Sequence, residues 1–279
     1  MPLDFRYHLA SLAAVFGALI IGILLGVAMR EGPALTDQIK VLEAAYGKSE
    51  ALRKIDARTD DFNGKTQGLL IRNRLAGRTV ALIANPLPRA GDELSTVRNT
   101  LEDAGATVNT TISLTPALEK LSPERLLALY QGMGSVDIPS HPDTAELMGR
   151  MAHALGVAGT PLFTALLDAK LIKVSGDPTL PVSAIVYIGG AAAKQSYLSD
   201  LDLPFLHGCG ELGVPFAAVE PFDIDISVMA DYQKVAPLTI DNIDRNAGRI
   251  TLVLALSKNL NGHFGYKDST DSTVPDVEE

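Results

Sequence analysis

The chain has 279 residues, 47% of them hydrophobic, and a formal net charge of −9 at pH 7. This acidic balance, with no run of Lys or Arg, argues against a nucleic-acid partner or an anionic-lipid patch. A lone cysteine, Cys209, excludes an internal disulfide and leaves the redox compartment open.

An uncharged apolar segment from residue 9 to residue 29 predicts a transmembrane anchor over residues 1–30. As a helix its length matches the roughly 30 Å hydrocarbon core of a bilayer. One alternative is a signal peptide, since Gly26-Val27-Ala28 resembles a cleavage site, but the segment is longer than a signal h-region. The other alternative, a buried core helix, rarely needs apolar side chains on every side. With no second run of this length, we expect a single pass.

Small residues recur at every fourth position of this segment. On a helix they form one stripe, which lets two helix backbones approach closely in lipid. The stripe predicts a helix-packing face and a homodimer, and its members are Ala10, Ala14, Ala18, Gly22 and Gly26.

Residues 31–75 keep a helical rhythm and predict a coiled-coil stalk. Apolar side chains and threonines alternate at spacings of three and four, which is the pattern of a coiled-coil seam. Glycines and threonines weaken the pattern, so an amphipathic helix packed on its own domain stays an alternative. The seam consists of Leu35, Ile39, Leu42 and Tyr46, then Leu52, Ile55, Thr59, Phe62, Thr66 and Leu69.

Residues 76–265 predict a Rossmann-like α/β domain with a doubly wound parallel sheet, because buried-strand patterns alternate with helical ones. We expect strands over 78–84, 107–112, 183–188, 215–219 and 238–240. Helices are expected over 92–104, 126–130, 144–155, 162–171, 227–234 and 248–258. The polar, acidic residues 266–279 predict a disordered tail.

No catalytic motif supports an enzymatic activity. The turn after the first predicted strand lacks the G-x-G-x-x-G pattern, and no Walker loop or G-x-S-x-G elbow is present. Gly189-Gly190 follows a predicted strand and could bind an anion at a helix N-terminus, or could simply permit close packing.

Candidate ligands for a soft metal are few. His207 and Cys209 stand two residues apart, and Met148, Met151 and His153 cluster on one predicted helix. Thiolate, thioether and imidazole are ligands that suit Cu(I). The alternative is that the methionines fill the core and Cys209 is a small buried hydrophobe.

Two terminal motifs resemble the mycobacterial copper transport protein B family, also described as copper transporters or outer-membrane channels. The first runs from Asp4 to Phe16 and continues into Gly22–Gly26. The second comprises Ile240–Asp244 and Gly262–Gly265. The resemblance covers the chain apart from its acidic tail and carries no agreed catalytic or metal-binding residues.

The resemblance implies a membrane-anchored envelope protein with a role in copper homeostasis or efflux. It places the α/β domain outside the cytoplasm, although the basic residues around the anchor weakly favour the opposite orientation. Some relatives are linked to cell division and cell-wall hydrolase control, so an envelope scaffold that docks a partner protein is an alternative. One helix cannot form a pore by itself.

Overall fold

The computed structural model describes residues 15–16, 18–20, 48–86, 90–134, 139–190, 197–224 and 226–276. Residues 1–59 and 60–279 form two separate units. Most of the predicted anchor, including Ala10, Ala14, Gly22 and Gly26 of its stripe, lies outside the described residues, whereas Ala18 is helical and exposed. No helix within the described ranges is long and apolar enough to cross a membrane.

Helical structure continues from residue 48 to residue 71, within the region predicted as a stalk. In the second unit this helix packs against the α/β fold. Ile71 and, after a turn, Leu75 are each only 1% exposed and belong to its core. Residues 60–75 are therefore part of the α/β unit, which begins earlier than the predicted boundary at residue 76.

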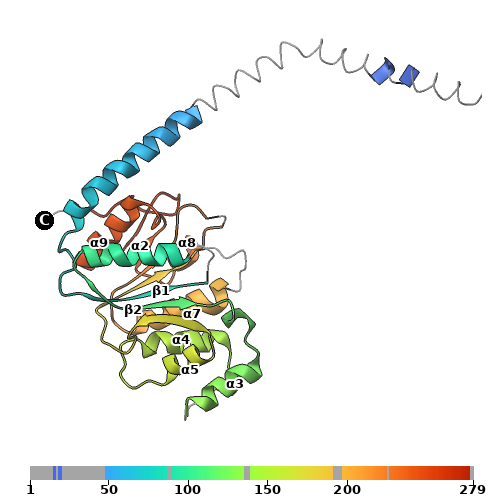
Figure 1. Cartoon of the computed structure of the whole chain (residues 1–279), viewed down its shortest axis with the longest axis vertical. Coiled ribbons are helices and arrows are strands. Elements are labelled where there is room, and N and C mark those ends of the chain that lie inside the picture. The colour runs from blue at the N-terminus through green and yellow to red at the C-terminus, as the bar shows by residue number, and fades with distance from the viewer. Residues whose placement is uncertain are drawn as a thin grey trace, which may run out of the picture. The chain divides into compact units, whose positions relative to one another are not determined.

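A sheet of seven strands organises the described part of the second unit (Figure 1). Its order is β3-β2-β1-β4-β5-β6-β7, and all neighbouring pairs are parallel except β2 with β3. A mixed α/β fold with a mostly parallel sheet, as predicted, is confirmed. The strands are β1 (Thr79–Ala84), β2 (Thr107–Leu114), β3 (Ile172–Gly176), β4 (Ala184–Ile188), β5 (Phe216–Val219), β6 (Leu238–Ile240) and β7 (Gly262–Phe264).

Helices cover both faces of the sheet, because alternate side chains of its central strands point to opposite sides. On β4, Ile185 and Tyr187 belong to one hydrophobic core, and Val186 and Ile188 to the other. The first core is covered by α3 (Pro123–Gly132), α4 (Thr144–Ala154), α5 (Leu162–Asp168), α7 (Leu203–Glu211) and α8 (Met229–Tyr232). The second is covered by α2 (Ala90–Asp103) and α9 (Asn246–Lys258), which lie on the other side of the sheet from α4 and α5 in Figure 1.

Short helical turns complete the described elements. The turn η1 (Leu118–Lys120) follows β2, and the π-helical turn η2 (Leu198–Asp202) leads directly into α7. Side chains cap two of the longer helices. The Ser122 hydroxyl accepts from the amide of Arg125 at the start of α3, and Asp143 Oδ1 accepts from the amide of Glu146 at the start of α4.

Residues 266–276 correct the prediction of a disordered tail. They follow β7 in turns, and the backbone amide of Gly265 donates to Ser272 O at 3.0 Å. The amides of Tyr266 and Lys267 donate to the buried carboxylate of Asp241, each at 2.7 Å. Polar composition alone predicted disorder here, but these contacts hold the segment against the sheet.

Candidate functional site

The carboxyl ends of β1 and β4 form the most promising site by position. The chain leaves β1 toward β2 on one side and returns to β4 on the other, so these two strands flank a topological switch point. In open α/β sheets ligands bind in the crevice at such a point. We call Asn85, Tyr187, Asp202 and Tyr232 the switch-point cluster; each is at most 1% exposed.

Asp202 lies at the centre of the switch-point cluster, where η2 ends. The hydroxyl of Tyr187 donates to its Oδ1 and the hydroxyl of Tyr232 to its Oδ2, both at 2.5 Å. The side-chain amide of Asn85 lies 3.4 Å from Oδ2 and also 3.4 Å from the carbonyl oxygen of Gly190. Strand β4, helix α8 and the end of β1 therefore converge on one buried carboxyl group at the end of η2.

Burial sets the protonation of this cluster. It raises the pKa of Asp202 to about 6, although the hydrogen bonds from Tyr187, Tyr232 and Asn85 oppose that rise. Burial, and then the negative charge of Asp202, raise the pKa of both tyrosines well above the ordinary value. Both phenols therefore remain protonated donors, and the carboxyl group is the member that changes charge near neutral pH.

Gly189 leaves room for Tyr232 to enter the cluster. A Cβ at this position would lie 1.8 Å from the Tyr232 hydroxyl. The amide of Gly190 donates to the same hydroxyl at 3.3 Å, so the protein itself uses this donor. The geometry therefore gives Gly189-Gly190 a close-packing role.

Asn85 Oδ1 is buried and has no hydrogen-bond partner within the described part of the chain.

A second polar cluster lies at the ends of β5 and β6. Glu220 and Asp241 directly follow these strands, and both are 0% exposed. Lys267 donates to Glu220 Oε1 through its ammonium group, Ser227 donates to the same oxygen, and the amide of Val228 donates to Oε2 at 3.1 Å. The backbone amides of Tyr266 and Lys267 also donate to Asp241. Together these bonds fix the segment after β7 over the carboxyl ends of β5 and β6.

Gly265 belongs to the second terminal motif, and the structure shows why a glycine is needed at this position. Its φ is +146°, and a Cβ there would lie 1.8 Å from Asp241 Oδ1. Only glycine lets the backbone pass this close to the carboxylate. Asp241 and Gly265, one from each half of the second terminal motif, therefore form a single structural contact.

His207 and Cys209, the predicted metal ligands, are not brought together. Both lie on α7, where residues two apart point in nearly opposite directions. His207 is exposed, whereas Cys209 is 0% exposed in the core. Burial raises the pKa of the Cys209 thiol, which disfavours the thiolate that a metal would need.

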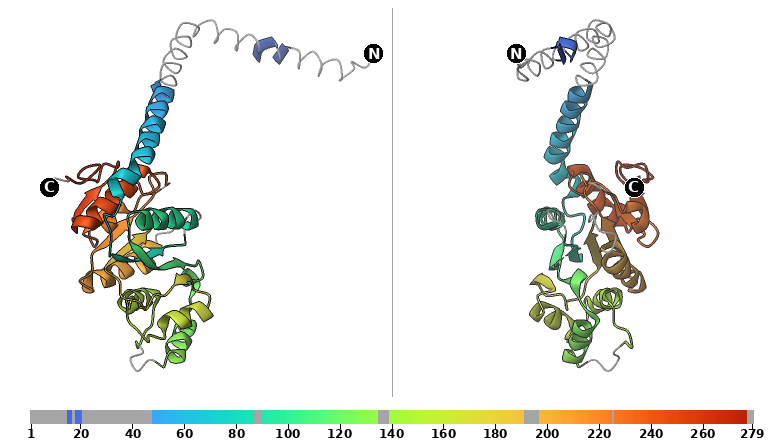
Figure 2. Two further views of the ribbon diagram at one scale, coloured as in Figure 1. Left: turned by 60° about the vertical axis from the view of Figure 1, so that its left-hand side comes forward. Right: turned by 90° about the vertical axis from the view of Figure 1, so that its right-hand side faces the viewer.

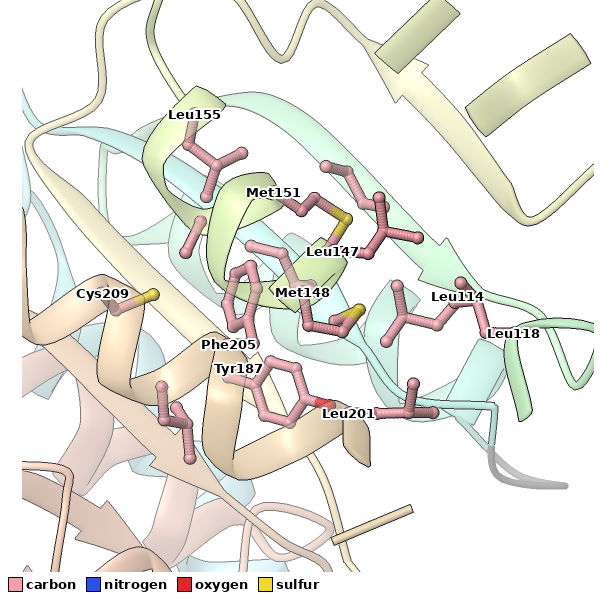
Figure 3. Close-up of a cluster of buried hydrophobic side chains, with 14 of the residues drawn as sticks. Leu114, Leu118, Leu147, Met148, Met151, Leu155, Tyr187, Leu201, Phe205 and Cys209 are labelled. Carbon is pink, nitrogen blue, oxygen red and sulfur yellow. The ribbon is translucent and has the colours of Figure 1, made fainter. Parts of the chain in front are cut away.

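The other candidate ligands are also separated. Figure 3 shows Met148, Met151 and Cys209 among apolar side chains that include Phe205 and Leu147. His153 lies outside this core, 2.9 Å from the Glu211 carboxylate. In the described ranges, no group of three or more His, Cys, Asp or Glu side chains could hold a metal ion.

Two surface hollows of about 580 and 530 Å³ lie beside α3 and α5, and Met133 and Pro161 line both. Tyr130 and Arg150 line the second, where the guanidinium carbon lies 5.2 Å from the centre of the ring. The Tyr130 hydroxyl is buried without a hydrogen-bond partner among the described residues. Since Tyr130 is 0% exposed beneath this contact, its hydroxyl is closed to a ligand.

Sequence reasoning missed the switch-point cluster. Tyr187 was predicted only as part of an apolar strand, and no helix or strand was predicted over residues 198–211. The sequence carries only a weak signal: Asp202 stands between two leucines, and a carboxyl group buried with such neighbours requires donors, but Asp200 two residues earlier makes the position look like part of a polar turn. The partners, Tyr187 and Tyr232, are too far away in sequence for a motif to reveal them.

Comparisons with known proteins identify one family. The family model described as "Copper transport outer membrane protein, MctB" matches residues 3–275. The copper transporters MctB of Mycobacterium bovis and of two Mycobacterium tuberculosis strains are each 25% identical to the chain. Each alignment covers 95% of this chain and 95% of the relative.

Proposed function

Because the chain belongs to the MctB family of copper transport proteins, we propose that it is a membrane-anchored envelope protein that acts in copper homeostasis. The observation that carries this proposal is the family match over residues 3–275, which includes both terminal motifs. The mycobacterial relatives are named copper transporters and align over nearly their whole length, so the role proposed for this chain concerns the same ion.

The proposed arrangement is one transmembrane helix followed by a helical stalk and an α/β head outside the cytoplasm. The uncharged residues 9–29 support the anchor by their length. The strand order, with the return to β4 beside β1 and helices on both faces, supports a Rossmann-like head. The family likeness supports the extracytoplasmic location of the head.

The described side chains do not fit a copper site. The softest candidate ligands, Cys209 and Met148, lie in the core, and the imidazole of His207 points to the other side of α7 from the thiol. We therefore treat copper as the ion whose handling the protein supports, and assign no ligand set in the head. The switch-point cluster, which Asp202 and the two tyrosines close, serves to fix the strand ends.

A complementation experiment tests the proposed role. In a strain that encodes this protein, deletion of its gene should change the copper concentration that inhibits growth, and the full chain should restore it. Zinc and hydrogen peroxide serve as controls for a general envelope defect. Equal copper tolerance with and without the gene would contradict the proposal.

The same strain tests the predicted ligands. We expect His207→Ala and Cys209→Ala chains to restore copper tolerance as fully as the unchanged chain, since the two side chains do not converge. Immunoblotting against the unchanged chain controls for expression. Loss of tolerance in both variants at equal protein levels would show that these residues take part in copper handling.

A further inference from the structure

The helix over residues 60–71 is held to the α/β unit by one of its faces. Asp60 Oδ1 accepts from the backbone amide of Asn246, and Asp60 O accepts from the side-chain amide of Asn246, both at 3.1 Å. Gly64 lies beside the same residue, since a Cβ there would be 3.1 Å from Asn246 Nδ2. Together with the buried Ile71, these contacts define the docked face, which lies against the start of α9. Figure 2 shows this end of the helix beside the α/β unit.

Large apolar side chains lie on the opposite side of this helix. At 3.6 residues per turn, Phe62 is about 180° and Leu69 about 160° around the helix axis from Ile71. Their side chains are 64% and 77% exposed. The docked face therefore does not include the apolar side chains of the predicted stalk pattern, which stay exposed. Packing of this helix on the α/β unit cannot explain why those positions are apolar.

The same pattern continues in the first unit. Leu52 and Ile55 are 57% and 61% exposed on helical residues. In sequence, the spacings from Leu52 to Leu69 alternate between three and four, as in coiled-coil a and d positions. We call this set, Leu52, Ile55, Thr59, Phe62, Thr66 and Leu69, the stalk stripe.

The hydroxyl groups of both threonines in the stalk stripe already have hydrogen-bond partners within the helix. The Thr59 hydroxyl donates to Ile55 O, and the Thr66 hydroxyl donates to Phe62 O, both at 2.9 Å within the helix. Burial would therefore not leave either hydroxyl without a partner, which is the main cost of burying a polar group. Each side chain also presents a methyl group, so the threonines are compatible with an apolar interface.

We propose that the stalk stripe pairs with the same stripe of a second copy of this chain, in a parallel two-stranded coiled coil. The heptad spacing selects a helix of matching periodicity as the occupant. The 47 residues that precede this helix contain further heptad positions, Leu35 to Tyr46, and the proposed anchor. The parallel direction rests on that anchor, because two copies that start in one membrane bring their stalks side by side in the same orientation.

Cysteine cross-linking of the full chain in its membrane tests the pairing. Thr59→Cys places a thiol on the stalk stripe, and Ala57→Cys places one two residues away on the far side of the helix; both positions are exposed. The native Cys209 is buried and common to both variants. We expect diamide to link Thr59→Cys into dimers about tenfold more than Ala57→Cys. Equal linking of the two, or none in either, would overturn the proposal.

A second experiment separates the stalk stripe from the anchor as the source of a dimer. The mass of the purified full chain in detergent is measured by light scattering at several concentrations. Replacing Phe62 and Leu69 together by Asp should raise the dimer dissociation constant at least about tenfold, since charges enter the seam. Leu127→Asp, at a 39% exposed position on α3, is the matched control and should leave it unchanged.

Both substituted side chains are exposed, so the fold should survive, and unchanged thermal unfolding by circular dichroism checks this. A dimer that persists in the double Asp variant would place the association elsewhere and overturn the proposal. So would a wild-type chain that is monomeric at every concentration.

Discussion

Asp202 shows how a single buried residue can make stability depend on pH. Its carboxyl group is enclosed by two tyrosine hydroxyls and an amide, and its pKa rises to about 6. In the unfolded chain an aspartate has a pKa of about 3.9. Between these values the folded state binds more protons than the unfolded state, so the free energy of unfolding falls as pH rises.

We therefore expect Asp202 to lower the free energy of unfolding by up to about 3 kcal/mol between about pH 4 and pH 7. Urea titrations at each pH measure this free energy of unfolding. Tyrosine fluorescence is the probe, because the chain has no tryptophan. Asp202→Asn keeps the size of the side chain and removes its titration, so its stability should fall less over the same range. Identical pH profiles for the two chains would show that Asp202 is already ionised throughout.

Two buried tyrosines should respond differently to loss of their hydroxyl groups. Tyr232 donates to Asp202 and accepts from Gly190, so Tyr232→Phe should cost roughly 1.5–3 kcal/mol of stability. The Tyr130 hydroxyl is buried without a partner among the described residues, so Tyr130→Phe should be neutral or stabilising. Chemical unfolding at one pH measures both changes. A comparable loss in both variants would mean that Tyr130 has a bound water or other partner.

At the scale of elements, the segment after β7 acts as a strap over the ends of β5 and β6. Its Lys267 ammonium bonds to Glu220, which is 0% exposed. Lys267→Met should cost about 3–5 kcal/mol, because it leaves a buried carboxylate without its cation. Lys234→Met is the control, since its ion pair with Asp231 is exposed and should be worth little. Unfolding titrations of both variants test this, and a similar small loss in each would refute the role of the strap.

The central strands were predictable from sequence because they are buried on both faces. β1 and β4 are almost entirely apolar, and the structure places them within a residue of the predicted ranges. The edge strands β3 and β7 were missed. Most of β3 is exposed, and β7 has three residues with glycine at its start, so neither has a strong hydrophobic pattern. The neighbouring strand supplies the hydrogen bonds that define them.

The positions of site residues were hard to predict for a different reason. His207 and Cys209 are close in sequence, but the α-helix separates them. The switch-point cluster joins Asn85 to Tyr232 through the fold, and no local pattern encodes that contact. The family resemblance was confirmed by the match over residues 3–275, and in the second terminal motif the fold needs the close approach of Asp241 and Gly265.

At the scale of the whole molecule, the orientation of the proposed anchor would decide on which side of the membrane the α/β head acts. The basic residues around residues 9–29 weakly favour a cytoplasmic head, whereas membership of the family favours an extracytoplasmic one. A charge count is a weak guide when both flanks carry few basic residues. We therefore expect the N-terminus in the cytoplasm and the head outside.

Thiol labelling of intact cells tests this orientation, and the structure shows where to place the thiol. Native Cys209 is buried and should react poorly in the folded chain. Thr164→Cys adds a thiol at an exposed position on α5. A membrane-impermeant maleimide should label Thr164→Cys in intact cells and leave the unchanged chain unlabelled. If Thr164→Cys reacts only after lysis, the head is cytoplasmic, and the proposed role must then concern copper inside the cell.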